Sequence, residues 1–305
     1  MQQFHAETTD VSVKATVDYP FSLDLKFYRS ANSDLEGFSD HDLRAHFYIH
    51  GIHEGRPGSP CVFREKFLSL VSKTAHTLEI GPFCSPVLRG PNVKYFDVAE
   101  RDALIRRAIL HHQGHTDPPA IDYVSPTGDM AVIDEEFDQI FSSHCVEHQP
   151  NLIRHFNQVE RLLRKGGSYF LIVPDKRFCF DHFLPETTIA DVLSAQIEQK
   201  ILHSPRSVLE HRHLTTHNDP VRHWQGDHGT PAIQTQDVDT VLLWIDQLAK
   251  SGDAYLDVHA WHFTPAVFED VVNQLYRLGL SKLRADRIYN TPAGRFEFCA
   301  ILSNH

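Results

Sequence analysis

Short apolar segments alternate with amphipathic segments between residues 61 and 173, and this alternation limits the fold more than any other feature of the chain. The predicted strands cover residues 78–80, 93–97, 121–124, 137–143 and 168–173, and the predicted helices cover residues 61–73, 99–112 and 151–164. Strands that alternate with helices form a parallel, doubly wound sheet. The pattern therefore predicts an α/β fold with a mostly parallel sheet.

The first predicted strand ends in a turn that leaves room for a ligand. Glu79 stands at the end of this strand, and Gly81 then turns the chain with no Cβ atom in the way. The next strand ends in Asp97, whose carboxylate can accept hydrogen bonds from ribose hydroxyls. This combination is the general device by which an open parallel sheet holds a nucleoside.

Composition and charge limit where the chain works and what it binds. It has 305 residues, enough for one large domain or a medium domain with a small appendage. No apolar run approaches the ~20 residues that span a bilayer, and the N-terminus does not resemble a signal peptide. A net charge of -11 argues against non-specific binding to nucleic acid or anionic membranes.

The cysteines and histidines add two expectations. The five cysteines are dispersed without a CxxC pair, which predicts reduced thiols and a cytoplasmic location. The 22 histidines are unusual and leave metal binding, acid–base chemistry or a drifted composition open.

We divide the chain into two parts. Residues 1–57 are predicted to form a lead-in and a small helical module, in which Ser39 caps a helix over residues 40–50 and Gly51 ends it. Residues 57–60 read as a linker, and residues 61–305 form the main domain. Within that domain, residues 176–258 interrupt the alternation as a histidine-rich cap with partial helices at 188–202 and 238–250.

Regular structure returns after the cap. A helix is predicted at residues 265–278, and strands at 283–289 and 296–302 form a closing hairpin. An α/β sheet that ends in a hairpin is unusual for dehydrogenases and usual for class I methyltransferases. Together with the absence of a G-x-G-x-x-G spacing, it argues against an NAD-dependent oxidoreductase.

Several motifs carry a family resemblance: Leu78-Glu79-Ile80-Gly81, Phe96-Asp97, Phe137-Asp138-x-Ile140, Glu147-His148 and Leu162-Leu163-Arg164-Lys165-Gly166-Gly167. With the closing hairpin they resemble class I S-adenosylmethionine-dependent methyltransferases over residues 61–302. The likeness is greatest to the type 11 group found in bacterial polysaccharide and glycosyltransferase operons. The N-terminal module is similar to one seen beside such enzymes. The resemblance implies a seven-stranded Rossmann-like sheet and S-adenosylmethionine as cofactor.

The resemblance also implies a set of cofactor contacts. Glu79, Gly81, Pro82 and Phe83 would line the methionine end, and Asp97 would bind the ribose. Asp129 and Met130 would lie at the adenine, and Ser143 and His144 beneath the sulfonium. The chain departs from the family pattern after Gly81, where the later glycines of the loop are replaced.

His144, Glu147 and His148 are candidate metal ligands. Their i, i+3, i+4 spacing would place them on one face of a helix, as an incomplete site with open positions. The related form Glu-x-x-Glu-His binds a divalent metal in small-RNA 2′-O-methyltransferases and some ubiquinone-pathway O-methyltransferases. Two alternatives remain open: Glu147-His148 caps and packs without metal, or His144 or His148 is a general base.

A second set of candidates follows the fifth strand and faces the same cleft. Asp175 or Asp181 could orient a substrate hydroxyl, and Arg177 could hold a carboxylate or phosphate. The alternative is a surface loop with incidental charges. In the histidine-rich part of the chain, Trp224 and Trp261 suit stacking on a sugar, and we expect at least one histidine to reach the site.

The sequence therefore predicts a cytoplasmic S-adenosylmethionine-dependent methyltransferase. The expected reaction is O-methylation of a sugar hydroxyl or related small polar acceptor, of the kind needed in bacterial polysaccharide biosynthesis, with a divalent metal as a second candidate cofactor. The alternative is a non-catalytic or metal-dependent variant of the fold, acting as a binding protein or a metalloenzyme. The oligomeric state does not follow from the sequence.

Overall fold

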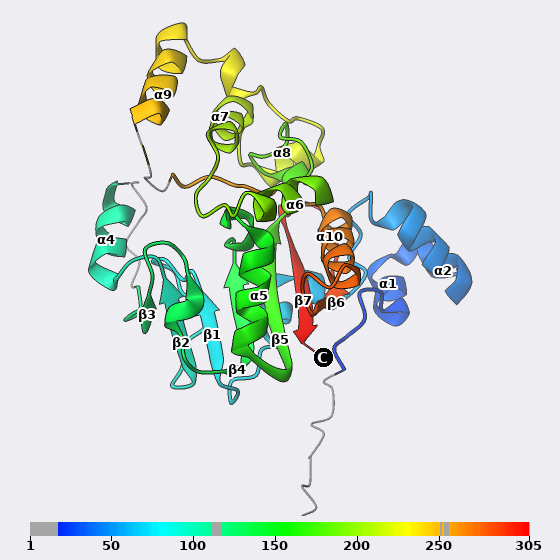
Figure 1. The fold of residues 1–305 in the computed structure, drawn as a ribbon. Helices are drawn as coiled ribbons and strands as arrows, with labels where there is room; N and C mark the ends of the chain where they lie inside the picture. Colours follow the sequence, from blue (N-terminus) through cyan, green and yellow to red (C-terminus); the bar gives the residue numbers. More distant parts are fainter. Residues whose placement is uncertain (1–17, 111–117, 251, 253–255, 305) are drawn as a thin grey trace, which may run out of the picture.

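The computed structural model describes residues 18–110, 118–250, 252 and 256–304. Within this part of the chain, seven strands form one sheet in the order β3-β2-β1-β4-β5-β7-β6 (Figure 1). The first five are parallel, and β7 runs antiparallel to both β5 and β6. The strands are β1 (Thr77–Ile80), β2 (Val93–Asp97), β3 (Tyr123–Val124), β4 (Phe137–Ser143), β5 (Leu163–Pro174), β6 (Leu283–Ile288) and β7 (Glu297–Asn304). The predicted fold class, a Rossmann-like methyltransferase fold with a C-terminal antiparallel hairpin, is confirmed.

The helices are α1 (Leu25–Ala31), α2 (Asp40–His46), α3 (Arg64–Leu68), α4 (Arg101–Leu110), α5 (Leu152–Leu162), α6 (Ile189–Ile197), α7 (Pro205–Leu214), α8 (Pro220–Trp224), α9 (Val238–Lys250) and α10 (Pro265–Arg277). The helix predicted at 61–73 is much shorter, and the last two residues of the one predicted at 99–112 lie outside the described residues. Sequence analysis missed α7 and α8. Both begin with proline after a capping residue, Ser204 and Asp219.

The main core follows from the alternation of side chains along β5. Tyr169, Leu171 and Val173 face one side of the sheet, where they pack with residues of α5 and α10. Phe170 and Ile172 face the other side and pack with residues around α3. Helices therefore cover both faces of the central strands, which explains why β5 is apolar along its second half.

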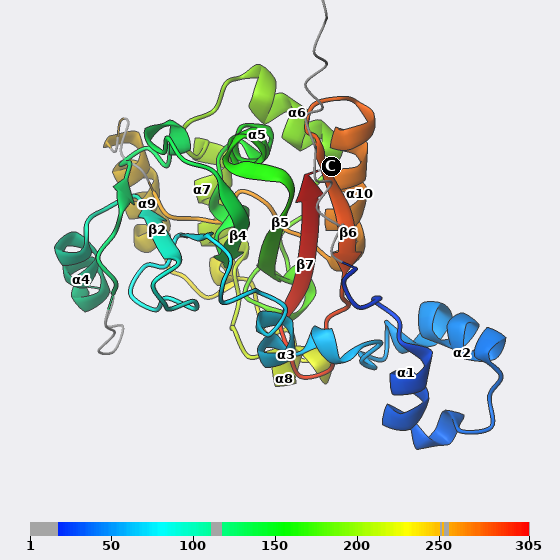
Figure 2. The same ribbon diagram turned by 90° about the horizontal axis from the view of Figure 1, so that it is seen from below.

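The N-terminal module has its own small core, formed by Leu23, Tyr28, Leu35, Leu43 and Phe47. The predicted cap is present, because the Ser39 side chain accepts a hydrogen bond from Asp42 N; the helix then gives way to a π-helix at Phe47–Gly51. Figure 2 shows α1 and α2 projecting to one side of the sheet. The segment predicted as a linker is fixed to the sheet edge, where Gly58 N donates to Asn290 Oδ1. The division into two domains stays a prediction.

In the part of the chain that the structure describes, no helix is both long enough and apolar enough to cross a bilayer.

A buried hydrogen-bond chain joins α5 to the sheet. The Tyr169 hydroxyl lies 2.7 Å from Ser142 Oγ and 3.0 Å from His155 Nε2. Burial lowers the pKa of His155 to about 3. Because the unfolded chain binds this proton near pH 6.5 and the folded chain does not, folding loses stability as the pH falls below 6.5.

We predict that His155→Gln makes the protein less sensitive to acid. One titrating group of this kind contributes about 1.4 kcal/mol per pH unit, so the parent should lose ~2 kcal/mol more than the variant between pH 8 and pH 5. Urea unfolding at the two pH values measures the difference. His41→Gln is the control, because that side chain is 92% exposed. Equal losses in the parent and in His155→Gln would contradict the prediction.

Candidate active site

The carboxyl ends of three adjacent strands meet at one edge of the sheet. Gly81 follows β1, Asp97 ends β2, and His144 follows β4, with β1 between the other two strands. Gly81 has a φ of +67°, and a Cβ atom here would lie 3.3 Å from Cys145 Sγ. A glycine is therefore needed for both the backbone conformation and the close approach of the next loop.

Two buried carboxylates shape the loop after β1. Glu79 accepts hydrogen bonds from Val87 N at 2.8 Å and Leu88 N at 2.9 Å, and burial raises the pKa of its carboxyl to about 7. Asp97 accepts one from Phe83 N at 3.0 Å, and burial raises the pKa of Asp97 as well. Phe83 adopts a φ of +45° in making this contact. The two carboxylates therefore fix the loop through backbone hydrogen bonds, although its later glycines are missing.

Asp129 and Met130 lie between β3 and α5. Asp129 Oδ2 pairs with Arg154 at 2.7 Å, and Oδ1 accepts hydrogen bonds from Ala131 N and the Gln158 amide. The hydrogen bond from Ala131 N lowers the pKa of Asp129 most. Burial raises this pKa to a smaller extent, and the charge of Arg154 lowers it further, so the net pKa is below its usual value. Met130 is only 1% exposed and belongs to the main core. Asp129 thus fixes α5 to this loop.

Glu147 is the most unusual side chain at this edge. It lies on a short 3-10 helix, Val146–His148, and is 0% exposed. Neither of its carboxylate oxygens has a hydrogen-bond partner among the described residues. A buried carboxylate without hydrogen bonds or a counterion costs several kcal/mol, so this position requires compensation.

The expectation of a shared helical face is wrong. His144 has a φ of +50°, and α5 begins only at Leu152, after the 3-10 turn. The backbone turns sharply after β4 instead of continuing into a helix. His144 and His148 approach Glu147 from either side of that turn.

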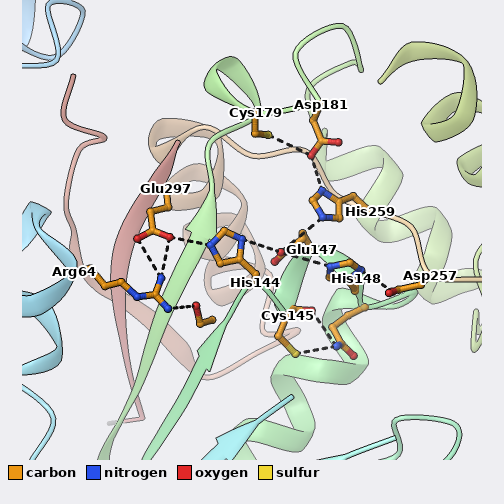
Figure 3. Close-up of polar contacts among 12 residues, drawn as sticks. Arg64, His144, Cys145, Glu147, His148, Cys179, Asp181, Asp257, His259 and Glu297 are labelled. Atoms are coloured by element: carbon orange, nitrogen blue, oxygen red, sulfur yellow. Dashed lines mark hydrogen bonds and ion pairs between the residues drawn. The ribbon is translucent and has the colours of Figure 1, made fainter. Parts of the chain in front are cut away.

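Three imidazoles surround the Glu147 carboxylate (Figure 3). His144 Nδ1 and His148 Nε2 each lie 3.8 Å from Glu147 Oε1, and His259 Nε2 lies 3.9 Å from the same atom. The ligand atoms of Glu147, His148 and His259 all lie within 4.8 Å of one another. These distances are too long for hydrogen bonds and leave a gap between the nitrogens and the oxygen.

The far nitrogen of each imidazole faces a carboxylate. Three pairs have this arrangement: His144 Nε2 with Glu297 at 2.9 Å, His148 Nδ1 with Asp257 at 3.0 Å, and His259 Nδ1 with Asp181 at 2.5 Å. Because an ionised carboxylate only accepts, the ring proton belongs on the far nitrogen. In a neutral imidazole held this way the near nitrogen turns a lone pair toward Glu147, which is the arrangement of histidines that bind metals.

The surrounding charges differ from one imidazole to the next. Burial lowers the pKa of His259 to about 3, with the nearby His148 adding to the effect. Burial also lowers the pKa of His148, but Asp257 and Glu147 outweigh it and the net pKa is raised. The pKa of Asp181 is raised by burial. At neutral pH the His259 ring is therefore neutral.

Arg64 and Ser143 extend the network behind His144. Arg64 binds Glu297 at 2.9 Å and donates to Ser143 Oγ at 2.9 Å. Burial alone would raise the pKa of Glu297, but His144 and Arg64 outweigh it and lower that pKa. Ser143 and His144 are thus both held by polar contacts at the end of β4.

His259 was not among the ligands that sequence analysis predicted. Its segment is fixed to the 3-10 turn by hydrogen bonds from Ala260 N and Trp261 N to Glu147 O, at 2.7 and 3.2 Å. The Trp261 indole also donates to Gln149 O at 2.6 Å. Sequence analysis noted His259 only as part of the histidine-rich region, because nothing local in the sequence shows what the segment crosses.

Comparison with known families identifies the domain that carries this edge. Residues 88–171, from just before β2 to the middle of β5, match the model of a family described as a methyltransferase domain. The chain contains an S-adenosylmethionine-dependent methyltransferase domain. No curated protein matches the chain significantly.

Solved structures give weaker likenesses. A Rhodobacter sphaeroides protein described as a Zn-dependent alcohol dehydrogenase is 14% identical, with 82% of this chain and 92% of that chain covered and a TM-score of 0.40. The CcbJ methyltransferase from Streptomyces caelestis is 14% identical, with 84% and 95% covered and a TM-score of 0.37. The glycopeptide N-methyltransferase MtfA bound to sinefungin is 17% identical, with 42% and 56% covered and a TM-score of 0.28. Likenesses this low decide nothing about the reaction.

Two predicted catalytic residues of the methyltransferase domain lie outside the Glu147 cluster. Asp175 is 0% exposed and binds Arg177 through both oxygens, at 2.9 and 2.6 Å. The Asp175 carboxylate also accepts a hydrogen bond from Thr291 Oγ1 at 2.7 Å. This pair fixes the loop after β5, so we assign it a structural role.

A pocket of about 320 Å³ opens beside the segment that carries His259. Its walls come from α6, α7 and residues 260–262. His262 Nδ1 lies 3.1 Å from Pro185 O, while its buried Nε2 has no hydrogen-bond partner among the described residues. Burial lowers the pKa of His262 to about 4, so the ring is neutral at pH 7 with a lone pair on Nε2.

Proposed function

We propose that this chain is a metal-assisted O-methyltransferase that transfers the methyl group of S-adenosylmethionine to a small hydroxyl compound such as a sugar. The observation that carries the proposal is the buried Glu147 carboxylate, which lacks hydrogen bonds among the described residues and faces three imidazole nitrogens. The sugar class rests on the likeness of the N-terminal module alone.

The ligand set favours a particular kind of metal. Glu147, His144, His148 and His259 would supply one oxygen and three nitrogens. Imidazoles suit manganese, iron, cobalt or zinc better than magnesium, which prefers oxygen ligands. Ligand atoms with bonds of ~2.0–2.2 Å lie roughly 3.0–3.6 Å apart, so the 3.8–3.9 Å from Glu147 Oε1 to the nitrogens of His148 and His259 needs to close by a few tenths of an ångström. The ligand atoms of these three residues lie within 4.8 Å of one another, and His144 would have to move closer to join them.

A bound divalent metal would act as a Lewis acid that makes an acceptor hydroxyl easier to deprotonate. The chain's own residues do the rest. The pocket admits a compound of small-molecule size, in the range typical of ligand sites. We assign to His262 the removal of the acceptor's proton, because this residue lines the pocket and its Nε2 has no hydrogen-bond partner among the described residues. Transfer is then in-line displacement at the methyl group, governed mainly by positioning.

For the cofactor we propose contacts with the loop from Gly81 to Phe83 and with Asp97 at the sheet edge. The Asp97 carboxylate accepts hydrogen bonds from Phe83 N and Val98 N, and a carboxylate has about four acceptor sites. Ribose hydroxyls can therefore add to these contacts. Ser143 and His144 would lie beneath the sulfonium, whereas Glu79, Asp129 and Met130 would act by holding the surrounding loops.

Asp97→Ala should weaken binding of S-adenosylhomocysteine by ~10- to 100-fold, because a charge-assisted pair of hydrogen bonds to the ribose is lost. Isothermal titration calorimetry measures the change. Asp138→Ala is the control, since Asp138 lies at the opposite end of β4 and pairs with Arg164. If both variants bind as the parent does, the cofactor lies elsewhere.

Glu147→Gln should remove the metal while leaving cofactor binding intact, because the substitution keeps the shape and removes the charge. We expect no bound Mn²⁺ or Zn²⁺ at this site, parental affinity for S-adenosylhomocysteine, and a loss of methyl transfer of ~100-fold or more. Transfer is followed by release of S-adenosylhomocysteine with a panel of sugars and other small hydroxyl compounds. Methylation that survives both chelation and Glu147→Gln would rule out the metal-assisted mechanism. Failure of the parent to methylate any hydroxyl compound, while it methylates amines, would rule out O-methylation.

His262→Gln should lower the rate of methyl transfer by ~100-fold at saturating acceptor without changing affinity for S-adenosylhomocysteine or metal content, because the proton acceptor is lost. Steady-state kinetics with the identified acceptor measures this. His203→Gln, in the same pocket wall, is the control. An unchanged rate in His262→Gln would exclude this residue as the base.

A further inference from the structure

A second group of histidines lies in the cap, apart from the Glu147 cluster. His182 belongs to the turn that follows β5, His223 lies on α8, and His228 lies in the turn after α8. Each offers a ring nitrogen, and these three atoms all lie within 4.8 Å of one another. His223 is only 2% exposed, so the group is partly shielded from solvent.

Main-chain carbonyls orient two of the three rings. His182 Nδ1 lies 2.8 Å from Arg177 O, and His223 Nε2 lies 3.1 Å from His217 O. A carbonyl oxygen only accepts, so each of these nitrogens carries the ring proton. The opposite nitrogen, Nε2 of His182 and Nδ1 of His223, is left with its lone pair. This is how metal-binding histidines are held in the required tautomer.

His228 completes the group. Its Nδ1 lies 3.1 Å from His223 Nδ1, so the His228 ring donates a hydrogen bond to the His223 lone pair. The rings of His182 and His228 are stacked with their centroids 3.7 Å apart. A bound ion requires the His228 ring to turn out of this stack. The same movement breaks the hydrogen bond between the two Nδ1 atoms and frees the His223 lone pair for the ion.

A fourth histidine, His217, stacks on His223 but does not belong to the ligand set. Its Nε2 lies 3.0 Å from Asp227 O, and its Nδ1 accepts a hydrogen bond from Asp219 N at 3.2 Å. Both ring nitrogens are therefore used by the main chain. Of these four rings, only those of His182, His223 and His228 can each offer a nitrogen to an ion. A four-coordinate ion would have one more ligand position, which water can fill.

We propose that His182, His223 and His228 bind a second divalent transition-metal ion, for which Zn²⁺ is the best fit. Neutral imidazoles are borderline-soft ligands that Zn²⁺ binds at about 2.0–2.1 Å, and three such ligands plus water make a four-coordinate site. The inference does not depend on the proposed function, because it uses none of the residues around Glu147.

The site would connect the cap to the catalytic edge. His182 is the neighbour of Asp181, whose carboxylate holds His259 at 2.5 Å. His223 and His228 come from the cap, so one ion would fix the cap turn to the loop that orients a ligand of the first site. Its role is therefore structural, and its loss should change stability more than chemistry.

The test uses the full chain, stripped of metal by chelation and free of any histidine tag, with Zn²⁺ as the probe. Glu147→Gln removes the first site, so the second is measured alone by competition with a colorimetric chelator. We expect one Zn²⁺ per chain in Glu147→Gln and none in the double variant with His228→Ala. Adding His213→Ala to Glu147→Gln instead is the matched control and should leave one Zn²⁺, because His213 is a cap histidine outside the group.

A thermal melt without metal checks that the His228→Ala double variant is folded, and the same melt with Zn²⁺ gives a second readout. Zn²⁺ should raise the melting temperature of Glu147→Gln by several degrees and leave that of the double variant unchanged. The inference is overturned if Glu147→Gln binds no Zn²⁺, or if the folded double variant still binds one. If the proposed first site fails, the parent binds a single ion that depends on His228 and not on Glu147, so the two failures are distinguishable.

Discussion

The buried carboxyl group of Glu147 is the constraint on which the rest of this edge depends. The carboxylate has no hydrogen bonds, and its nearest polar neighbours are three imidazole nitrogens at 3.8–3.9 Å. Removing such a charge from water is costly unless a cation compensates it. A divalent ion in the gap would compensate the charge and use all three lone pairs.

The fold assembles this arrangement from distant parts of the chain. The carboxylates that orient the three histidines come from β7, from the turn after β5 and from the segment before α10. The closing hairpin therefore contributes to the site as well as to the sheet, because Glu297 at the start of β7 binds both His144 and Arg64. The cap contributes Asp181, whose carboxylate pairs with His259. Each contribution is a short polar contact between elements that the sheet order brings together.

The sequence was sufficient for the sheet and for part of the site. Parallel strands buried on both faces appear as continuous apolar runs, so the second half of β5 could be predicted from residue type alone. His144, Glu147 and His148 could be selected because they follow β4 within five residues. His259 could not be assigned, since its place depends on a tertiary hydrogen bond to the Glu147 carbonyl. Asp175 and Arg177 stay predictions as substrate contacts; the structure shows that the two side chains bind each other, which residue type alone does not reveal.

The loop after β1 is held by hydrogen bonds although part of its glycine motif is missing. Its later glycines are replaced, yet the loop is held by backbone hydrogen bonds to the buried carboxylates of Glu79 and Asp97. A comparison of sequences shows only that the glycines are lost. The carboxylates of Glu79 and Asp97, which hold the loop instead, are ordinary residues of the motif and do not stand out in the sequence. The cofactor edge can therefore remain open to a nucleoside although its glycine pattern has changed.

The most direct test of the metal centre is a crystal structure of the chain with Mn²⁺ and S-adenosylhomocysteine, with anomalous diffraction recorded at the manganese edge. The account predicts an anomalous peak within bonding distance of Glu147 and of the near nitrogens of His144, His148 and His259. The peak should lie beside the cofactor sulfur and next to the pocket lined by His262. A map without a peak at Glu147, with its carboxylate instead hydrogen-bonded directly to a histidine, would contradict the account.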